Sequence, residues 1–293
     1  MIVINLTGGL GNQLFQYALG RYLATRLDAE LVIDDSFYRN QRVGVTPRRY
    51  ELDKFATQLR MVTEGERRYL KRYTNRCLRY LQKYITIPGR FRYVREPLNR
   101  LLLEVRDYTG DLFLDGYWQS EHYFDGVQEQ VRRDLTPQIE LSSDDKAVLE
   151  AMESGTSVSL HVRRGDYVTH AQTNAWHGVC GLDYYAKAMQ LLESRISNLH
   201  YFVFSDDMAW VKANLKIEQP CTYVSHNDEA TAVNDLLLMS SCQHHVIANS
   251  SFSWWGAWLN PDPDKLVIRP AVWLKQLTHM NESVCPASWV KIG

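Results

Sequence analysis

Two adjacent arginines follow a short apolar run in the stretch SVSLHVRRGDYV, which spans residues 157–168. Arginine is costly to desolvate unless an anion pairs with it, and its planar guanidinium donates in a fork that suits phosphate oxygens. Asp166 supplies one local anion for Arg163 and Arg164. A structural ion pair would use only one of the two cations, so the pattern favours a site for an anionic ligand.

The residues before the arginines predict a strand that ends at Gly165. Side chains alternate between the two faces of a strand, so His161 and Arg163 share one face while Leu160 and Val162 take the other. Ligands of open α/β sheets bind outside the carboxyl ends of the strands. We therefore expect His161 and the arginine pair to lie at such a ligand site.

A second candidate site lies in the stretch ANSSFSWWGAWLN, where an apolar strand is followed by a helix. Ser250 and Ser251 precede Phe252 at this junction, and serine is a favourable N-cap residue. The N–H groups of a helix N-terminus bind anions. The junction is therefore a second candidate anion site, whereas Trp258 in the helix is better explained by core packing.

The loop GGLGNQ also joins a strand to a helix, near the N-terminus. Gly11, Asn12 and Gln13 lie where backbone N–H groups could face a ligand. The spacing matches neither the GxGxxG dinucleotide fingerprint nor a P-loop with its lysine. A tight turn capped by Asn12 explains the loop equally well.

Two further predicted strand ends carry polar or aromatic side chains. Asp206 and Asp207 follow the strand YFVF, where a carboxylate could accept two N–H bonds from a guanine edge or cap the next helix. In GYWQSEHYF, Tyr117 and Trp118 could stack on a sugar ring, with Glu121 as a polar partner. Packing inside the protein explains these aromatic residues equally well.

The elements that must position these residues alternate between strand and helix. Residues 2–6 predict a buried strand, residues 12–27 a helix and residues 31–33 the next strand, which together form a β-α-β unit. Residues 112–118 predict a further strand. The second half repeats the alternation, with strands expected at 157–162, 201–204, 222–224, 245–248 and 266–268 and helices at 183–195, 207–214, 230–241 and 252–259.

We therefore expect an α/β fold with two doubly wound domains. The polar helix at 141–155 ends at a glycine and places the boundary near residue 150. The predicted domains are residues 1–150 and residues 151–270. They are followed by a C-terminal segment, residues 271–293, that packs back onto the N-terminal domain.

Residues 60–100 form a basic segment inside the first domain, with 12 Lys or Arg against 3 Glu. Tyrosine and leucine residues recur in it at helical spacing. A solvated helical face on an inserted hairpin is the simpler interpretation. The alternative is a patch that contacts an anionic membrane surface or a polyanionic acceptor.

The composition excludes several classes of protein. A chain of 293 residues is long enough for two domains, and a net charge of −1 argues against general nucleic-acid binding. The cysteines are scattered and form no metal or disulfide pattern. The first residues predict a strand and a turn instead of a signal peptide, and no apolar run approaches the roughly 20 residues of a membrane helix. We expect a cytoplasmic protein, peripheral at the inner face of the membrane if the basic segment makes that contact.

Taken in order, five motifs resemble those of glycosyltransferase family 11, the α-1,2-fucosyltransferases, and among them the bacterial members. The motifs are GGLGNQLFQYA, GYWQSEHYF, HVRRGDYV, SDD and NSSFSWWGAWLN. HVRRGD matches the HxRRxD pattern that α-1,2-, α-1,6- and, more loosely, protein O-fucosyltransferases share. The resemblance covers most of the chain. It implies a GT-B fold, in which two Rossmann-like domains face each other across a cleft and the second binds the donor.

The resemblance also implies inverting transfer of L-fucose from GDP-β-L-fucose to the 2-OH of a terminal galactose. The acceptor would be a surface glycan or an oligosaccharide, which can be lipid-linked, and no metal or other cofactor is implied. Arg163 is expected to bind the β-phosphate, with Arg164 and Asp166 orienting it or assisting catalysis. The implied substrate-binding residues are Gly11, Asn12, Gln13, His161, Asp206, Asp207, Ser250, Ser251 and Phe252. Tyr117, Trp118 and Glu121 are expected at the acceptor, and the general base stays open among Glu121, Asp115, Asp35 and His122.

Three other functions compete with this interpretation. One is a different GDP-fucose-dependent fucosyltransferase, α-1,6 or O-linked, against which the tryptophan-rich SSFSWWGAW argues by resemblance only. The second is a carbohydrate-binding protein without turnover, and the third is a nucleotide-binding regulatory protein. Consumption of an acceptor sugar separates both of these from an enzyme.

Overall fold

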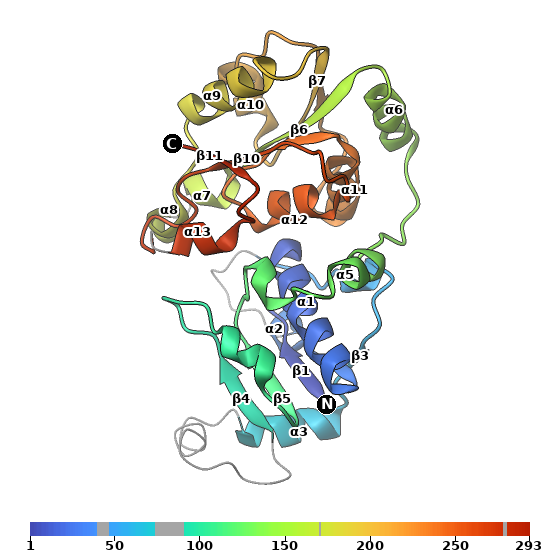
Figure 1. Ribbon diagram of the computed structural model, residues 1–293. Helices are drawn as coiled ribbons and strands as arrows, with labels where there is room; N and C mark the ends of the chain where they lie inside the picture. Colours follow the sequence, from blue (N-terminus) through green and yellow to red (C-terminus); the bar gives the residue numbers. More distant parts are fainter. Residues whose placement is uncertain (40–46, 74–90, 170, 278–279) are drawn as a thin grey trace. The chain divides into compact units, whose positions relative to one another are not determined.

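The computed structural model divides into two compact units, Met1–Thr136 and Pro137–Gly293 (Figure 1). The boundary lies before the predicted residue 150, because helix α6 (Ser143–Met152) packs onto the second unit through its apolar face. The residues that the structure describes are 1–39, 47–73, 91–169, 171–277 and 280–293.

A parallel sheet forms the first unit, with five strands in the order β3-β2-β1-β5-β4 among the described residues. The strands are β1 (Ile2–Asn5), β2 (Leu31–Asp34), β3 (Arg60–Met61), β4 (Arg92–Arg95) and β5 (Leu112–Asp115). The helices are α1 (Leu10–Leu27), α2 (Ser36–Arg39), α3 (Glu64–Tyr73) and α5 (Gln128–Asp134). The predicted β-α-β unit is confirmed as β1, α1 and β2. The further strand predicted at 112–118 is confirmed as β5. The two edge strands β3 and β4 are additional.

Helix α1 packs closely against β1 and β2. A Cβ on Gly20 of this helix would lie 2.8 Å from Leu31 Cδ1 and would collide with Ile4. Glycine in a helix interior costs about 1 kcal/mol relative to alanine. Here the cost is offset because the missing side chain lets the helix approach the sheet.

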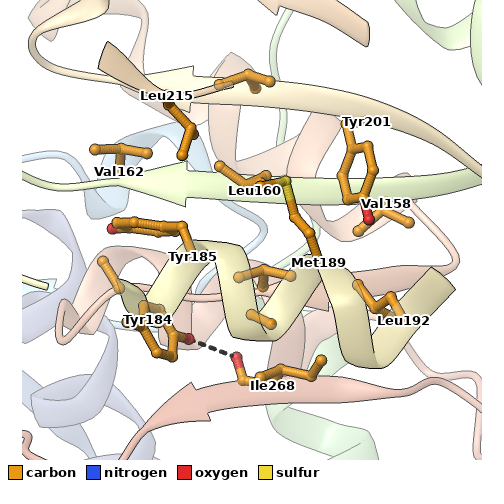
Figure 2. Close-up of a cluster of buried hydrophobic side chains, with 14 of the residues drawn as sticks. Val158, Leu160, Val162, Tyr184, Tyr185, Met189, Leu192, Tyr201, Leu215 and Ile268 are labelled. Carbon is orange, nitrogen blue, oxygen red and sulfur yellow. Dashed lines mark hydrogen bonds between the residues drawn. The ribbon is translucent and has the colours of Figure 1, made fainter. Parts of the chain in front are cut away.

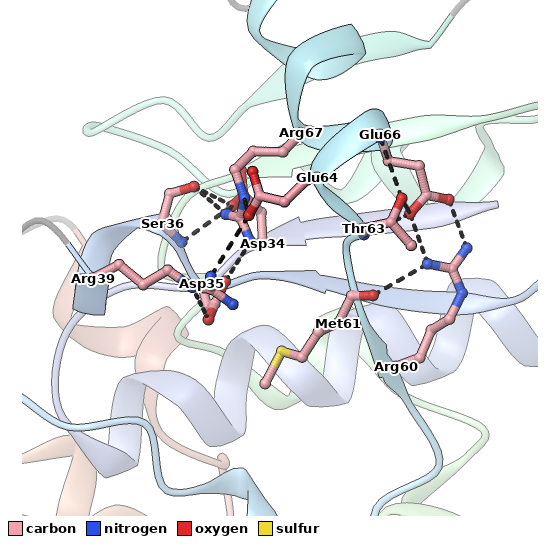
Figure 3. Close-up of polar contacts among 10 residues, drawn as sticks. All are labelled: Asp34, Asp35, Ser36, Arg39, Arg60, Met61, Thr63, Glu64, Glu66 and Arg67. Atoms are coloured by element: carbon pink, nitrogen blue, oxygen red, sulfur yellow. Dashed lines mark hydrogen bonds and ion pairs between the residues drawn. The ribbon is translucent and has the colours of Figure 1, made fainter.

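The basic segment contains a helix, α3, as predicted, but one of its basic side chains is buried and does not face solvent. Arg67 of α3 is buried and its Nη atoms lie 2.7 Å from Asp34 and 2.8 Å from Asp35, at the carboxyl end of β2 (Figure 3). This arginine therefore stabilises the first unit. Residues 74–90 of the predicted hairpin lie outside the described residues, so contact with a membrane stays a prediction.

A second parallel sheet forms the second unit, with six strands in the order β11-β10-β9-β6-β7-β8 among the described residues. The strands are β6 (Thr156–Val162), β7 (Leu199–Ser205), β8 (Cys221–Val224), β9 (His244–Val246), β10 (Val267–Pro270) and β11 (Val290–Ile292). The first five confirm the predicted strands. Both units are thus α/β with parallel sheets, as expected.

The helices of the second unit cover its sheet. They are α6, α7 (Gly165–Thr169), α8 (Ala171–His177), α9 (Leu182–Glu193), α10 (Met208–Asn214), α11 (Ala232–Ser241), α12 (Ser251–Leu259) and α13 (Asn281–Val284). The predicted helix at 141–155 is confirmed as α6, and the four helices predicted between the strands are confirmed as α9 to α12, whereas α7, α8 and α13 are additional. Within the described parts of the chain, no helix is both long enough and apolar enough to cross a membrane.

The main core of the second unit lies between α9 and one face of the sheet (Figure 2). Its buried side chains include Val158, Leu160, Val162, Tyr185, Met189 and Leu192. The Tyr184 hydroxyl of α9 lies 2.6 Å from the carbonyl oxygen of Ile247 and 3.1 Å from that of Ile268, and so ties the helix to the sheet. Because Leu160 and Val162 point into this core, His161 lies on the opposite face of β6, as the alternation predicts.

The C-terminal segment, residues 271–293, belongs to the second unit, and its packing onto the N-terminal domain stays a prediction. β11 pairs in parallel with β10. The ring of Trp289 lies 5.4 Å from that of Trp254 in α12, and Trp254 Nε1 donates to the carbonyl of Val284 at 3.0 Å. Strand pairing and the burial of these rings therefore hold the segment in place.

Asp145 joins α6 to the loop after β8 and to α11. Its buried carboxylate accepts hydrogen bonds from His226 Nε2 at 2.9 Å, Asn227 Nδ2 at 3.0 Å and Asn234 Nδ2 at 2.8 Å. Ser142, which caps α6, donates to the same carboxylate. Burial alone would raise the pKa of Asp145, but the hydrogen bonds outweigh burial and hold its pKa well below the usual range.

We predict that Asp145→Ala lowers the free energy of unfolding by about 3 kcal/mol, because it leaves several buried polar partners unsatisfied. A carboxylate with a depressed folded pKa gives its full stabilisation above the unfolded pKa of about 3.9, and that stabilisation is lost as the pH falls. Asp145→Asn should therefore lose less stability between neutral pH and about pH 3 than the wild type. Urea unfolding at both pH values measures this, with the exposed Asp144→Asn as control. An identical pH dependence of wild type and Asp145→Asn would contradict the prediction.

Candidate functional site

Arg163 and Arg164 stand at the carboxyl edge of the second sheet, directly after β6. β6 and β7 pair in parallel up to their last residues, so Asp206 and Asp207 begin their loop at the same edge. Arg163 Nη1 lies 3.0 Å from Asp206 Oδ2, and the backbone N–H of Arg164 donates to Asp206 Oδ1 at 2.8 Å. Asp206 thus binds the first guanidinium and the backbone of the second arginine.

Arg164 is held by a second carboxylate and an aromatic ring. Its Nε lies 3.3 Å from Asp207 Oδ2, and its guanidinium carbon lies 3.6 Å from the centre of the Trp210 ring. Asp207 also caps α10 by accepting the backbone N–H of Trp210 at 3.2 Å. An ion pair and a cation–π contact therefore keep Arg164 in one position, beside the partly exposed guanidinium of Arg163.

These contacts change the roles that the sequence predicts for the acidic residues. Asp206 and Asp207 each bind an arginine, which does not favour the prediction that one of them recognises a guanine edge. Gly165 makes the contact possible, because a Cβ there would collide with Asp206 Oδ2. Asp166 lies in α7, but its side chain is outside the described part of the chain, so its role toward the arginines stays a prediction.

His161 lies close to the start of α12, on the face of β6 away from the main core. Its ring centre is 5.8 Å from that of Phe252, and its Nδ1 has no hydrogen-bond partner among the described residues. Burial, and then the charge of Arg163, lowers the pKa of His161 to about 3. The imidazole is therefore neutral near pH 7 and has one donor and one acceptor nitrogen.

The start of α12 lies at the same sheet edge, because β9 is the neighbour of β6. Ser250 accepts the backbone N–H of Phe252 at 3.3 Å and caps the helix. Ser251 and Phe252 are half-buried. The structure thus brings the predicted Ser250–Phe252 junction next to His161 and the arginine pair.

Asn249 fixes this junction and is missing from the predicted site. Its Nδ2 donates to the carbonyls of His177 at 3.0 Å and Gly178 at 3.3 Å. Tyr167 donates its hydroxyl proton to the carbonyl of Asn249 at 3.2 Å. These bonds tie α7, which follows the arginines, to the start of α12. A lone asparagine at a strand end gives no sequence pattern that would reveal this role.

Asp235 of α11 is another acidic residue that the sequence analysis did not select. Asn227, in the loop after β8, donates its Nδ2 proton to Asp235 Oδ1 at 2.8 Å, which places Asp235 at the carboxyl edge of the sheet. Burial raises the pKa of Asp235 to about 6, against the opposing hydrogen bond from Asn227. A half-buried carboxylate with a shifted pKa at a ligand-binding edge is a candidate functional group.

The GGLGNQ motif of the first unit runs into the first turn of α1, whose N-cap is Gly9 and not Asn12, and hydrogen bonds to distant parts of the unit hold it. The side-chain amide of Gln13 is buried, donates to two backbone carbonyls at 3.3 and 2.7 Å and accepts a backbone N–H at 3.0 Å. Gly11 is buried beside it, and Asn12 Oδ1 accepts a hydrogen bond from Gln119 Nε2 at 2.7 Å. Gln13 therefore serves the fold of the first unit, and a direct contact of its side chain with the donor is not favoured.

The three predicted acceptor residues differ in how far their side chains are exposed. Trp118 is fully buried, with its ring 5.3 Å from that of Tyr123, so its ring does not face a sugar. Tyr117 is 47% exposed, which keeps its predicted stacking role available. Glu121 opens the short helix η3 (Glu121–Tyr123) and is half-buried.

Asp35 and Asp115, two candidates for the general base, are engaged by neighbouring side chains. Asp35 lies 2.7 Å from Arg39 Nε and 2.8 Å from Arg67 Nη2 (Figure 3). Burial raises the pKa of Asp35, but the hydrogen bonds from Arg39 and Arg67 outweigh it and lower the pKa. Asp115 accepts a hydrogen bond from the hydroxyl of Tyr93. A carboxylate whose pKa is lowered is a weaker base, so Asp35 is a poor candidate.

Both arginines at the second-sheet edge are paired, although the sequence predicts that one of the two cations lacks a protein partner. Arg163 and Arg164 bring two positive charges, Asp206 and Asp207 bring two negative charges, and the N-terminus of α12 adds partial positive charge. In the parts of the chain that the structure describes, no three His, Cys, Asp or Glu side chains gather as a metal site. The arrangement can stabilise negative charge on a ligand through protein groups.

Comparison with known proteins agrees with this geometry. The model of glycosyl transferase family 11 matches residues 98–293. The α-1,2-colitosyltransferase of Escherichia coli is 32% identical over 100% of this chain and 99% of its own length. The O-antigen biosynthesis glycosyltransferase WbnK of Escherichia coli is 35% identical over 98% of this chain and 99% of its own length. A structure of an Arabidopsis thaliana FUT1 mutant in complex with GDP shares the fold, with a TM-score of 0.53 at 13% identity over 99% of this chain and 75% of that one.

We predict that the imidazole of His161 stays neutral and does not titrate between about pH 5 and pH 8, unlike an ordinary histidine. The reason is its burial beside Arg163, which lowers the pKa to about 3. An NMR titration of the histidine side chains measures this, and His161→Asn identifies the signal. A midpoint for that signal inside the stated range would contradict the prediction.

Proposed function

The chain belongs to glycosyl transferase family 11, and on that premise we propose that it transfers L-fucose from GDP-β-L-fucose to the 2-OH of a terminal galactose. The observation that carries the proposal is the arginine pair at the edge of the second sheet, held by Asp206 and Asp207. A guanidinium fixed in this way suits a diphosphate that leaves with growing negative charge.

In the proposed reaction, Arg163 binds the β-phosphate of the donor. Negative charge grows on this phosphate as the bond to fucose C1 breaks, so a cation held in place stabilises the transition state more than the ground state. Ser251, at the start of α12, offers its backbone N–H to the same diphosphate, while the N–H of Phe252 is bound by the Ser250 cap. Arg164 and Asp206 position Arg163 and complete the charge balance.

Asp235 fits the role of guanine recognition better than Asp206 or Asp207 does. Its carboxylate, on α11, is bonded to Asn227 in the loop after β8, on the same sheet edge, and this is the one hydrogen bond described for it. Above its pKa of about 6 it is ionised and can accept two N–H bonds from a guanine edge. Neutral His161, beside Phe252, supplies a further hydrogen-bonding group for the nucleotide or the sugar.

We propose that the reaction needs no metal ion. Arg163, Arg164 and the N-terminus of α12 already provide positive charge where a diphosphate would bind. The acceptor is proposed to contact the exposed ring of Tyr117 in the first unit, since aromatic rings pack well on the apolar face of galactose. The similarity to an O-antigen biosynthesis glycosyltransferase supports a surface glycan as the acceptor.

A second candidate donor sugar is colitose. The similarity to an α-1,2-colitosyltransferase over the whole chain favours it, because donor sugars can differ between relatives at this level of identity. Colitose lacks the 3-OH of fucose, so a site that hydrogen-bonds that hydroxyl would strongly prefer fucose. The preference between the two sugars therefore depends on whether a protein group hydrogen-bonds the 3-OH.

The first test is incubation with GDP-fucose and lactose in excess EDTA, followed by linkage analysis of the product. We expect a 2-linked fucosyl product, formed at the same rate with and without EDTA, because protein cations neutralise the diphosphate. Parallel reactions with GDP-colitose compare the two donors. A product from GDP-colitose alone would assign the second sugar, loss of product in EDTA would overturn metal independence, and failure to bind GDP would overturn the donor class.

A second prediction concerns the arginine at the diphosphate. Arg163→Ala is expected to lower kcat by about 100-fold or more, as removal of one preorganised donor typically does. Arg163→Lys keeps the charge but loses the forked geometry, so it should recover only part of the rate. Steady-state kinetics with GDP-fucose and lactose measure both, and the exposed Arg195→Ala is the matched control. A kcat for Arg163→Ala within twofold of the control would contradict the assignment.

A further inference from the structure

A half-buried carboxylate fixes the loop that follows β5 in the first unit. Glu96, directly after β4, accepts the backbone N–H of Tyr117 at 2.8 Å and that of Trp118 at 2.7 Å through Oε2. Its Oε1 accepts the hydroxyl proton of Tyr123 at 3.1 Å. Burial raises the pKa of Glu96 against these opposing hydrogen bonds. The carboxylate of Glu96 therefore loses part of its hydration, and in exchange it binds backbone N–H groups of a neighbouring loop.

The backbone of this loop requires such support. Trp118 has a φ of 57°, in the left-handed region that bulky residues seldom adopt. Gly116 leaves room for the carboxylate, because a Cβ there would collide with Cβ of Glu96 and lie 2.8 Å from its Oε2. The unusual turn and the close approach of Glu96 thus depend on each other.

Two glutamine side chains hold the ends of the same loop. Gln16 Nε2 donates to the carbonyl of Gly116 at 2.8 Å, and Gln119 Nε2 donates to Asn12 Oδ1 at 2.7 Å. Within this fixed loop Trp118 points into the protein, while Tyr117 is 47% exposed. The loop therefore presents one aromatic ring to solvent in a defined orientation.

We propose that Glu96 is a positioning residue for the acceptor. It holds the left-handed turn at Trp118 and so presents the ring of Tyr117 to the acceptor sugar, without touching the sugar itself. This inference rests on the proposed transfer to a galactoside and assigns a role to a residue outside the predicted site. A purely structural role for Glu96 would instead lower stability and affect donor and acceptor alike.

Steady-state kinetics with both substrates varied separate these roles. Glu96→Ala is expected to raise the KM for lactose at least tenfold and to leave the KM for GDP-fucose within twofold, because only the acceptor loop is released. Glu96→Gln keeps an oxygen for the two backbone N–H groups and should recover most of the acceptor affinity. Tyr123→Phe removes the partner of Oε1, together with the acceptor of the Leu102 backbone N–H, but leaves the two N–H bonds of Oε2 in place. It is the matched control, with a smaller effect on the KM for lactose.

A measurement without substrate tests the same loop. Amide hydrogen exchange at Tyr117 and Trp118 should be faster in Glu96→Ala than in the wild type and in Tyr123→Phe. Gly116→Ala should reproduce the kinetic and exchange effects of Glu96→Ala, because its Cβ displaces the carboxylate. If Glu96→Ala does not fold, Gly116→Ala and Glu96→Gln provide the comparison.

The outcomes distinguish this inference from the proposed function. An unchanged KM for lactose together with unchanged exchange in a folded Glu96→Ala protein would overturn the positioning role. Equal increases in both KM values would assign Glu96 to the stability of the fold alone. Absence of transfer to any galactoside by the wild type would overturn the proposed function, while the exchange measurement would still show whether Glu96 holds the loop.

Discussion

The contact between Asp206 and the two arginines is the interaction on which the candidate donor site depends. Arg163 and Arg164 are adjacent in the chain, and two neighbouring cations at a strand end repel each other unless carboxylates separate them. Asp206 binds the guanidinium of the first and the backbone of the second, while Asp207 and Trp210 hold the second guanidinium. The cation is thereby in place before a ligand arrives, which lowers the cost of binding and of charge development.

The same device occurs in the first unit. Asp206 follows β7 and binds the backbone at the end of β6, and Glu96 follows β4 and binds the backbone at the end of β5. Parallel strands end at one edge of a sheet, so their loops leave side by side, and a carboxylate on one loop can fix the N–H groups of the next. In the second unit the fixed loop carries a cation, and in the first it carries an exposed tyrosine. One backbone constraint thus supports two kinds of recognition.

The sequence predicts the repeating elements and the residues at strand ends, because apolar runs and alternating faces are local signals. It also places His161, the arginines and the Ser250–Phe252 junction at ends of strands, and the family resemblance implies that they share one site. It does not predict that the partners of the arginines come from the next strand of the sheet and include Asp206, since that pairing depends on register. The burial of Trp118 is hidden as well, because the sequence shows neither its left-handed φ nor its packing against Tyr123. Short strands such as β3 and β11 escape prediction, because two or three residues are too few to show an alternation of apolar and polar side chains.

Two glycines show how a motif can conceal the reason for its own spacing. Gly165 in HVRRGD and Gly116 in GYWQS each follow a strand, where a glycine usually suggests a turn with positive φ. Neither adopts a positive φ in the structure. Each instead leaves space for a carboxylate from the neighbouring strand end, Asp206 in one unit and Glu96 in the other. The glycine and a distant acid therefore act as one feature, and both position a neighbouring residue of the motif, which is Arg163 in one unit and Tyr117 in the other.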